Sequence, residues 1–184
     1  MRLLYLILFP AVLATGCAHP PEHTPPIGRL NLNAPLTIPA GAASVRIQYG
    51  RTTAFNAVQE HDPFCVFEID AVADSPRILP PAGFDVLTLE RSVSTFAGLP
   101  IMPYHTRRVV FGPDDLPTHI YFKTRFMLAS DARNAQAATP ERALGLTCMS
   151  NQHMPGIAIM RHLSLADIRG ALGDLFTLEL HVPR

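Results

Sequence analysis

The chain lacks tryptophan, has only four tyrosines and carries few charged residues for its length of 184. Carbohydrate sites are often platforms of stacked aromatic rings, so this composition argues against sugar binding. Basic and acidic residues balance at 15 each, and Lys123 is the one lysine. The sequence has no basic run or patch, and we therefore expect no nucleic-acid partner.

Motifs of common catalytic sites are also missing. The chain has no Gly-x-Ser-x-Gly elbow, no His-Glu-x-x-His motif and no glycine-rich phosphate loop. The run Glu60-His61-Asp62 places three titratable groups before Pro63, but neighbouring side chains point in different directions, which favours a solvated turn. We therefore expect no cofactor and a non-enzymatic role. A hydrolase without a recognisable motif is the third alternative.

The N-terminal segment has the pattern of a secretory signal peptide, with Arg2, the apolar run Leu3–Leu13 and small residues before Cys17. The apolar run is shorter than the roughly 20 residues of a membrane-spanning helix. The ending Ala14-Thr15-Gly16-Cys17 resembles the lipobox of bacterial lipoproteins. This resemblance implies cleavage before Cys17, its acylation (palmitate) and, because Ala18 follows, sorting to the periplasmic face of the outer membrane. The alternatives are an ordinary signal peptide cut after Ala18 and an N-terminal anchor helix.

A proline-rich stretch follows Cys17. Residues 18–26 contain four prolines. Such a stretch stays extended and cannot pack into a core, so it is suited to a semi-rigid spacer between a lipid and a domain. We therefore divide the chain into a signal peptide (1–16), a lipid-attached tether (17–30) and a single β-rich domain (31–184). The domain is long enough to bury a sizeable core.

The remaining cysteines, Cys65 and Cys148, lie in strand-like apolar runs. Two cysteines in an exported chain most simply form one disulfide bond. That bond would close a loop of roughly 80 residues, which restricts the unfolded chain strongly. We predict that the two cysteines are joined and that their strands are neighbours.

Alternating apolar and polar residues predict strands through most of the domain. Ser44–Tyr49 and His119–Leu128 follow the two-residue period of a half-buried strand, and Thr124 is the exception in the second. Further strands are expected at 36–38, 64–69, 84–91, 144–149 and 175–182. We expect the strand at 64–69 to be central and covered on both faces.

One short amphipathic helix is expected near the C-terminus. Ser164 and Asp167 have the spacing of a capping box with Asp in place of Glu, and Gly173 suits the C-terminal cap. A single helix among short strands with Pro and Gly turns predicts a mainly β fold. We therefore expect an antiparallel sandwich or barrel-like domain with one short C-terminal helix.

A periplasmic copper-binding protein is the main alternative function. Thiolate, thioether and imidazole ligands select copper, and the order Cys148, His153, Met160 resembles that of cupredoxin blue-copper proteins. His119 or His105 would supply the second imidazole. The spacing departs from that family, because four residues separate Cys148 from His153 and six separate His153 from Met160. A disulfide at Cys148 would remove the thiolate, so the two predictions exclude each other, and we expect no metal.

One apolar loop has the composition of a contact surface. Leu99, Ile101, Met102 and Tyr104 lie among prolines in a stretch without a strand or helix pattern. Apolar loops of this kind cover a core or contact a partner. The flanking prolines lower the cost of ordering the loop, and these four residues are our candidate partner-binding patch.

Three segments of the body, Leu36–Gly41, Phe64–Glu68 and Leu79–Phe84, resemble small uncharacterised proteobacterial envelope lipoproteins. The resemblance is confined to these segments and implies an exported β domain with paired cysteines. It transfers no site. We expect a lipid-anchored accessory or interaction subunit of an envelope protein complex, held at the membrane by its lipid.

Overall fold

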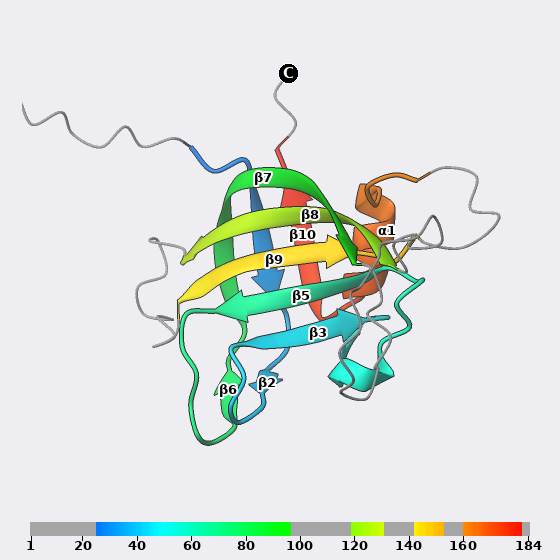
Figure 1. Ribbon diagram of the computed structural model, residues 1–184. Helices are drawn as coiled ribbons and strands as arrows, with labels where there is room; N and C mark the ends of the chain where they lie inside the picture. The colour runs from blue at the N-terminus through cyan, green and yellow to red at the C-terminus, as the bar shows by residue number, and fades with distance from the viewer. Residues whose placement is uncertain (1–24, 97–118, 131–141, 153–159, 182–184) are drawn as a thin grey trace, which may run out of the picture.

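The computed structural model describes residues 25–96, 119–130, 142–152 and 160–181 (Figure 1). Cys17, the loop Leu99–Tyr104 and His153 lie outside the described residues. Within the described part of the chain, no helix is long and apolar enough to cross a membrane.

Ten strands, one 3-10 helix (η1) and one α-helix are described. They are β1 (Gly28–Leu32), β2 (Leu36–Ile38), β3 (Ser44–Gln48), β4 (Arg51–Thr53), η1 (Phe55–Ala57), β5 (Phe64–Ile69), β6 (Arg77–Leu79), β7 (Ala82–Phe96), β8 (His119–Ser130), β9 (Ala143–Met149), α1 (Leu165–Leu172) and β10 (Phe176–Leu180). Eight strands form one antiparallel sheet in the order β10-β1-β7-β8-β9-β5-β3-β4, and β2 pairs with β6 in a small second sheet. The large sheet curls into half of a barrel (Figure 1). The mainly β fold with one short C-terminal helix is thus confirmed, in its barrel-like form.

The core lies on the inner face of the curled sheet, because successive residues of a strand point to opposite faces. Phe67 of β5 is fully buried there. Its ring centroid lies 5.6 Å from that of Phe84 in β7 and 5.4 Å from that of Phe176 in β10. Strand β10 lies at one end of the strand order and β5 lies in the other half of the sheet. These aromatic contacts across the core therefore stabilise the curled shape of the sheet.

Helix α1 packs against β3 and β5 in one half of the sheet and against β10 in the other. It buries Ile168, Ala171 and Leu172, the apolar stripe of the helix. The predicted capping box is confirmed, since the Ser164 side chain accepts from the Asp167 backbone and the Asp167 side chain accepts from the Ser164 backbone. The helix therefore begins where the sequence predicts, and it bridges the open side of the half-barrel.

The turn between β3 and β4 contacts the C-terminal end of α1. Gly50 N–H donates to the carbonyl of Ala171 at 2.9 Å. Gly50 and Gly173 both have positive φ, 76° and 52°, and Gly173 is the predicted C-terminal cap. A Cβ on Gly173 would lie 2.5 Å from the Gly50 Cα, so this close approach of two backbones needs glycine.

Cys65 and Cys148 form a disulfide bond, as predicted. They lie directly opposite each other on the neighbouring strands β5 and β9, with Cα atoms 4.0 Å apart, and both are fully buried. Thr124 of β8 is opposite Cys148 and shares this inner row. It is buried, and its hydroxyl has no hydrogen-bond partner among the described residues, so the polar exception in the alternation of β8 lies in the core.

Two sequence expectations need correction. The described domain begins earlier than residue 31, because β1 starts at Gly28 and pairs with both β10 and β7. The strand at 64–69 is not covered on both faces, because Val66 and Glu68 point outward and are only half-buried. The short strands β4 and β6 were also not predicted. Among the described residues, side chains of neighbouring strands, such as Tyr121 of β8 against Phe64, partly cover the outer face of β5.

Candidate functional site

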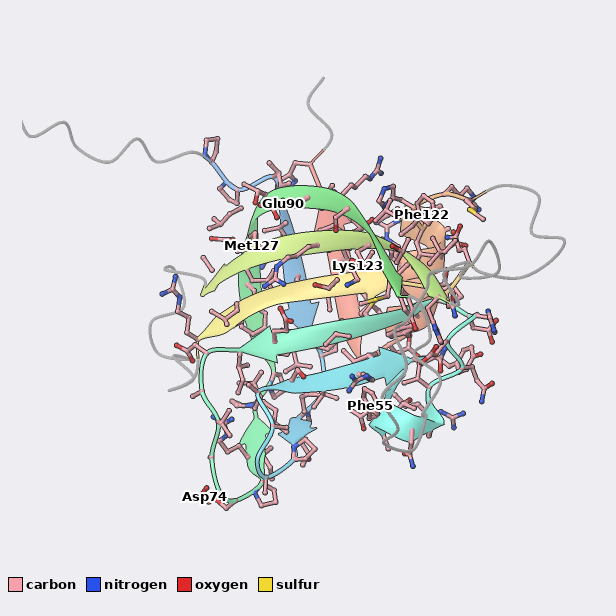
Figure 2. The ribbon with its side chains drawn as sticks, viewed as in Figure 1. Phe55, Asp74, Glu90, Phe122, Lys123 and Met127 are labelled. Carbon is pink, nitrogen blue, oxygen red and sulfur yellow. A yellow bond between two sulfur atoms is a disulfide. The ribbon has the colours of Figure 1, made fainter. Side chains whose placement is uncertain are left out.

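The outer face of β3, β5, β9 and β8 contains a hollow of about 460 Å³, which we call the outer groove. Figure 2 shows Lys123 on this face, where the four strands lie side by side, and Phe55 at its rim beside η1. The residues that line the groove come from strands and from the segment between β4 and β5: Arg46, Phe55, Val58, Glu60, Phe64, Val66, His119, Tyr121, Lys123 and Met149.

The floor of the outer groove is apolar. Phe64 and Val66 point outward from β5 because Cys65 between them points inward. Phe64 is paired in register with Met149 of β9. The Phe64 ring also stands edge-on to Tyr121, with centroids 6.4 Å apart. The disulfide row on the inner face thus determines which side chains the two strands present outside.

The segment after β4 forms one wall. Phe55 in η1 is 76% exposed, and the Arg46 guanidinium lies over its ring, 4.2 Å from the centroid. Burial lowers the pKa of Arg46, and the charge of Glu60 opposes this change. Arg46 keeps its positive charge at neutral pH, since the guanidinium group of arginine stays protonated in proteins.

Glu60 organises the polar end of the groove. Tyr121 donates its hydroxyl hydrogen to Glu60 Oε2 at 2.7 Å, and His119 Nε2 lies 3.4 Å from the same oxygen. The His119 and Tyr121 rings stack with centroids 6.1 Å apart. Burial raises the pKa of Tyr121 well above its usual range, and the hydrogen bond to Glu60 adds to this shift. Tyr121 therefore stays protonated at neutral pH and serves as a donor, not as a base.

A second hollow of about 320 Å³ continues the groove along β9 toward β7. The two hollows share Val66, Lys123 and Met149. In the second hollow, Arg125 pairs with Glu68 at 2.8 Å. Lys123, by contrast, has no ion-pair or hydrogen-bond partner among the described residues, so it is the cation most available to a ligand.

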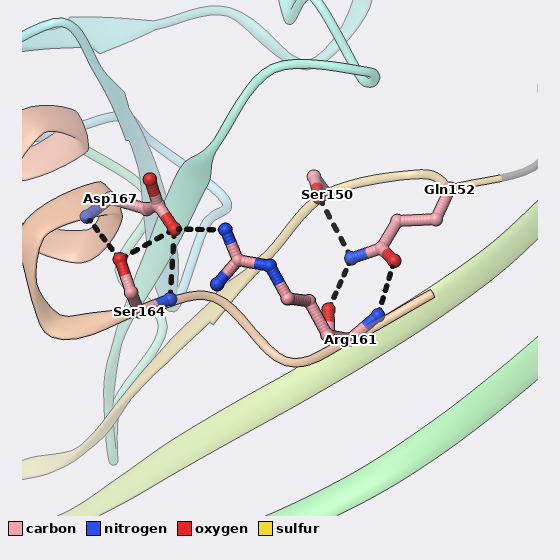
Figure 3. Close-up of polar contacts among 5 residues, drawn as sticks. All are labelled: Ser150, Gln152, Arg161, Ser164 and Asp167. Atoms are coloured by element: carbon pink, nitrogen blue, oxygen red, sulfur yellow. Dashed lines mark hydrogen bonds and ion pairs between the residues drawn. The ribbon is translucent and has the colours of Figure 1, made fainter. Parts of the chain in front are cut away.

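A polar cluster beside α1 is the other candidate, and Figure 3 shows its contacts. Gln152 accepts from Arg161 N–H at 2.8 Å and donates to the Arg161 carbonyl. Asp167 accepts from the Ser164 backbone at 2.9 Å and from its hydroxyl at 2.7 Å, and lies 3.7 Å from Arg161 Nη2. The hydrogen bonds from Ser164 lower the pKa of Asp167. These groups satisfy one another and fasten the segment before α1, so we assign the cluster to the fold.

The copper alternative loses its thiolate, because Cys148 is oxidised and points to the inner face. His119 lies on the outer face with Glu60, and Met160 is 50% exposed. His153 lies outside the described residues. Across residues 25–96, 119–130, 142–152 and 160–181, no three His, Cys, Asp or Glu side chains are placed to hold a metal ion.

The lipidation residue Cys17 and the apolar patch Leu99–Tyr104 also lie outside the described residues, so both stay predictions.

The run Glu60-His61-Asp62 behaves as expected, since its side chains have separate partners. Glu60 contacts Tyr121, the Nδ1 of His61 lies 3.1 Å from a backbone carbonyl oxygen, and Asp62 accepts from a tyrosine hydroxyl. The role of Glu60 in a groove was not predicted.

Comparison of this chain with known proteins finds no matching family model, no similar curated protein and no similar solved structure. An apolar floor, two cations and a carboxylate that accepts a hydrogen bond from Tyr121 form an arrangement suited to binding. Tyr121 of the outer groove stays protonated, and Cys148 on the inner face is oxidised, so neither residue is an activated nucleophile.

Proposed function

We propose that this chain is a lipid-anchored envelope protein whose β domain is a non-enzymatic interaction subunit on the periplasmic face of the outer membrane. The lipobox-like ending at Cys17 and the signal pattern before it support the anchor. The prolines of residues 18–26 favour an extended spacer of about 3 Å per residue before β1. Such a spacer holds the domain away from the lipid, where it can contact another envelope component.

The observation that carries the interaction role is the exposed pair of Phe55 and Arg46 at the rim of the outer groove. A phenylalanine that is 76% exposed is costly to leave in water, and a cation stacked on its ring fixes its orientation. Aromatic and arginine side chains are enriched among the residues that dominate binding energy at protein interfaces. This pair therefore has the chemistry of an anchor for a protein partner.

We expect a photo-crosslinking amino acid placed at position 55 to give a discrete adduct with an envelope protein in intact cells. Ile78 of β6 is the matched control, because it is 69% exposed but belongs to the small second sheet and does not line the groove. The same amino acid at position 78 should give no such adduct. The measurement is the mobility shift of the protein on a denaturing gel after illumination.

The charge of Arg46 provides a second check. Arg46→Glu in the crosslinking background should reduce the adduct at position 55 about tenfold, because it removes the stacked cation of the anchor. Equal adducts at positions 55 and 78, or none at either, would contradict the proposal that this rim contacts a partner.

A further inference from the structure

The outer groove has the size of a small-ligand site, and it combines an apolar floor with charged groups around it. Its volume of about 460 Å³ lies within the common range of small-molecule pockets, roughly 300–1,000 Å³. The floor around Val66 and Met149 is apolar and only half covered by neighbouring side chains. Phe55 and Val58 form a wall on one side. A ligand that filled this hollow would bury apolar surface without moving the strands.

The charges around the hollow favour an anionic ligand. Glu60, the acidic group that lines this hollow, is already held by Tyr121 and His119. Lys123 has no partner among the described residues, and Arg46 carries a second positive charge on the opposite wall. Among the described residues, no carboxylate forms an ion pair with Lys123.

The strand order sets the length of the ligand. Lys123 is on β8 and Arg46 is on β3, with β9 and β5 between them. Three strand spacings of about 4.8 Å separate the two cations by roughly 14 Å at the backbone. If the anionic group of a ligand lies on Lys123, the space between it and the Phe55 wall is about as long as a short alkyl or arylalkyl chain.

We propose that the outer groove binds a small amphipathic carboxylate, with its apolar body on Val66 and Met149 and its carboxylate on the Lys123 ammonium. This inference uses the same groove as the proposed interaction role but concerns a small molecule in the hollow, beside the rim that faces a protein. Glu60 keeps its negative charge at the polar end, where Tyr121 donates to it and His119 lies 3.4 Å away, so the carboxylate of the ligand is placed on Lys123.

The test uses 4-(4-fluorophenyl)butyrate, observed by ¹⁹F NMR, with the full chain in phosphatidylcholine nanodiscs and empty nanodiscs as the blank. We expect saturable broadening of the probe signal by the protein, and much weaker broadening of the neutral 4-(4-fluorophenyl)butanamide. Lys123→Gln should weaken binding of the carboxylate about tenfold, because a hydrogen bond to a charged group is lost. Lys123→Arg should retain most of it.

Arg91→Gln is the matched control, because it removes the same charge from the sheet at a different place. Arg91 of β7 is paired with the inward-pointing Thr124, so its side chain faces away from the outer groove. This variant should bind the probe like the parent chain.

Absence of saturable broadening, equal binding of the amide, or an unchanged affinity in Lys123→Gln would overturn the inference. If the adduct at position 55 persists in that case, the interaction role stands and the groove serves a protein segment instead. If the carboxylate binds but no adduct forms at position 55, the interaction role fails and the ligand site stands.

Discussion

Replacing both Cys65 and Cys148 by alanine is expected to lower the free energy of unfolding by about 4 kcal/mol. The disulfide closes a loop with a sequence separation of 83, for which the chain-entropy model gives about 4–5 kcal/mol. Both sulfurs are also fully buried, so their removal leaves a void in the core beside β8. Urea unfolding of the parent and of the double variant, both without reductant, measures the difference.

The reduced parent chain is the control for the alanine substitutions. With the bond reduced, the parent lacks the cross-link but keeps both sulfurs, so its midpoint should fall well below that of the oxidised parent and at or slightly above that of the double variant. A double variant that unfolds within about 1 kcal/mol of the oxidised parent would contradict the view that this bond supports the half-barrel.

Gly173→Ala is expected to destabilise the domain by about 3 kcal/mol or more. Gly173 has φ 52° and ψ −140°, a conformation that alanine adopts only with strain of about 1–3 kcal/mol. Its new Cβ would also lie 2.5 Å from the Gly50 Cα and 3.1 Å from the Gly50 nitrogen. Both neighbours are backbone atoms, so the β3–β4 turn must move away from α1 and weaken the hydrogen bond to Ala171.

Gly170→Ala is the matched control within the same helix. A Cβ at position 170 meets nothing within 4 Å, and alanine is favoured over glycine in a helix interior by about 0.5–1 kcal/mol. This variant should therefore be as stable as the parent or slightly more stable. Similar thermal midpoints for Gly170→Ala and Gly173→Ala would show that the Gly50–Gly173 contact does not hold the turn on the helix.

Local sequence patterns predict the strands that have one face on the core and one toward solvent. The alternation in β3, β8 and β10 is visible for this reason, and the capping box of α1 is visible because it needs only four consecutive residues. Strand β1 escapes prediction, since Gly28 and Asn31 have low strand propensity. It forms because β7 and β10 pair with it on both sides, and such pairing depends on segments far away in the chain.

The outer groove could be predicted only in part. Outward positions such as Arg46 and Lys123 follow from the alternation of their own strands. Their proximity does not, because it depends on the order β8-β9-β5-β3, which brings together segments that are far apart in the sequence. No local sequence pattern predicts that Phe55 is exposed at the rim, because its position depends on the path of the chain after β4.

We propose that Cys17 anchors a periplasmic binding domain to the outer membrane. Fractionation of cells that express the parent chain or Cys17→Ser tests it most directly, with immunoblots of the soluble, inner-membrane and outer-membrane fractions. We expect the parent in the outer-membrane fraction and the variant either released into the soluble fraction or retained uncleaved at higher mass. Recovery of mature-size Cys17→Ser protein in the outer-membrane fraction, in the same proportion as the parent, would contradict it.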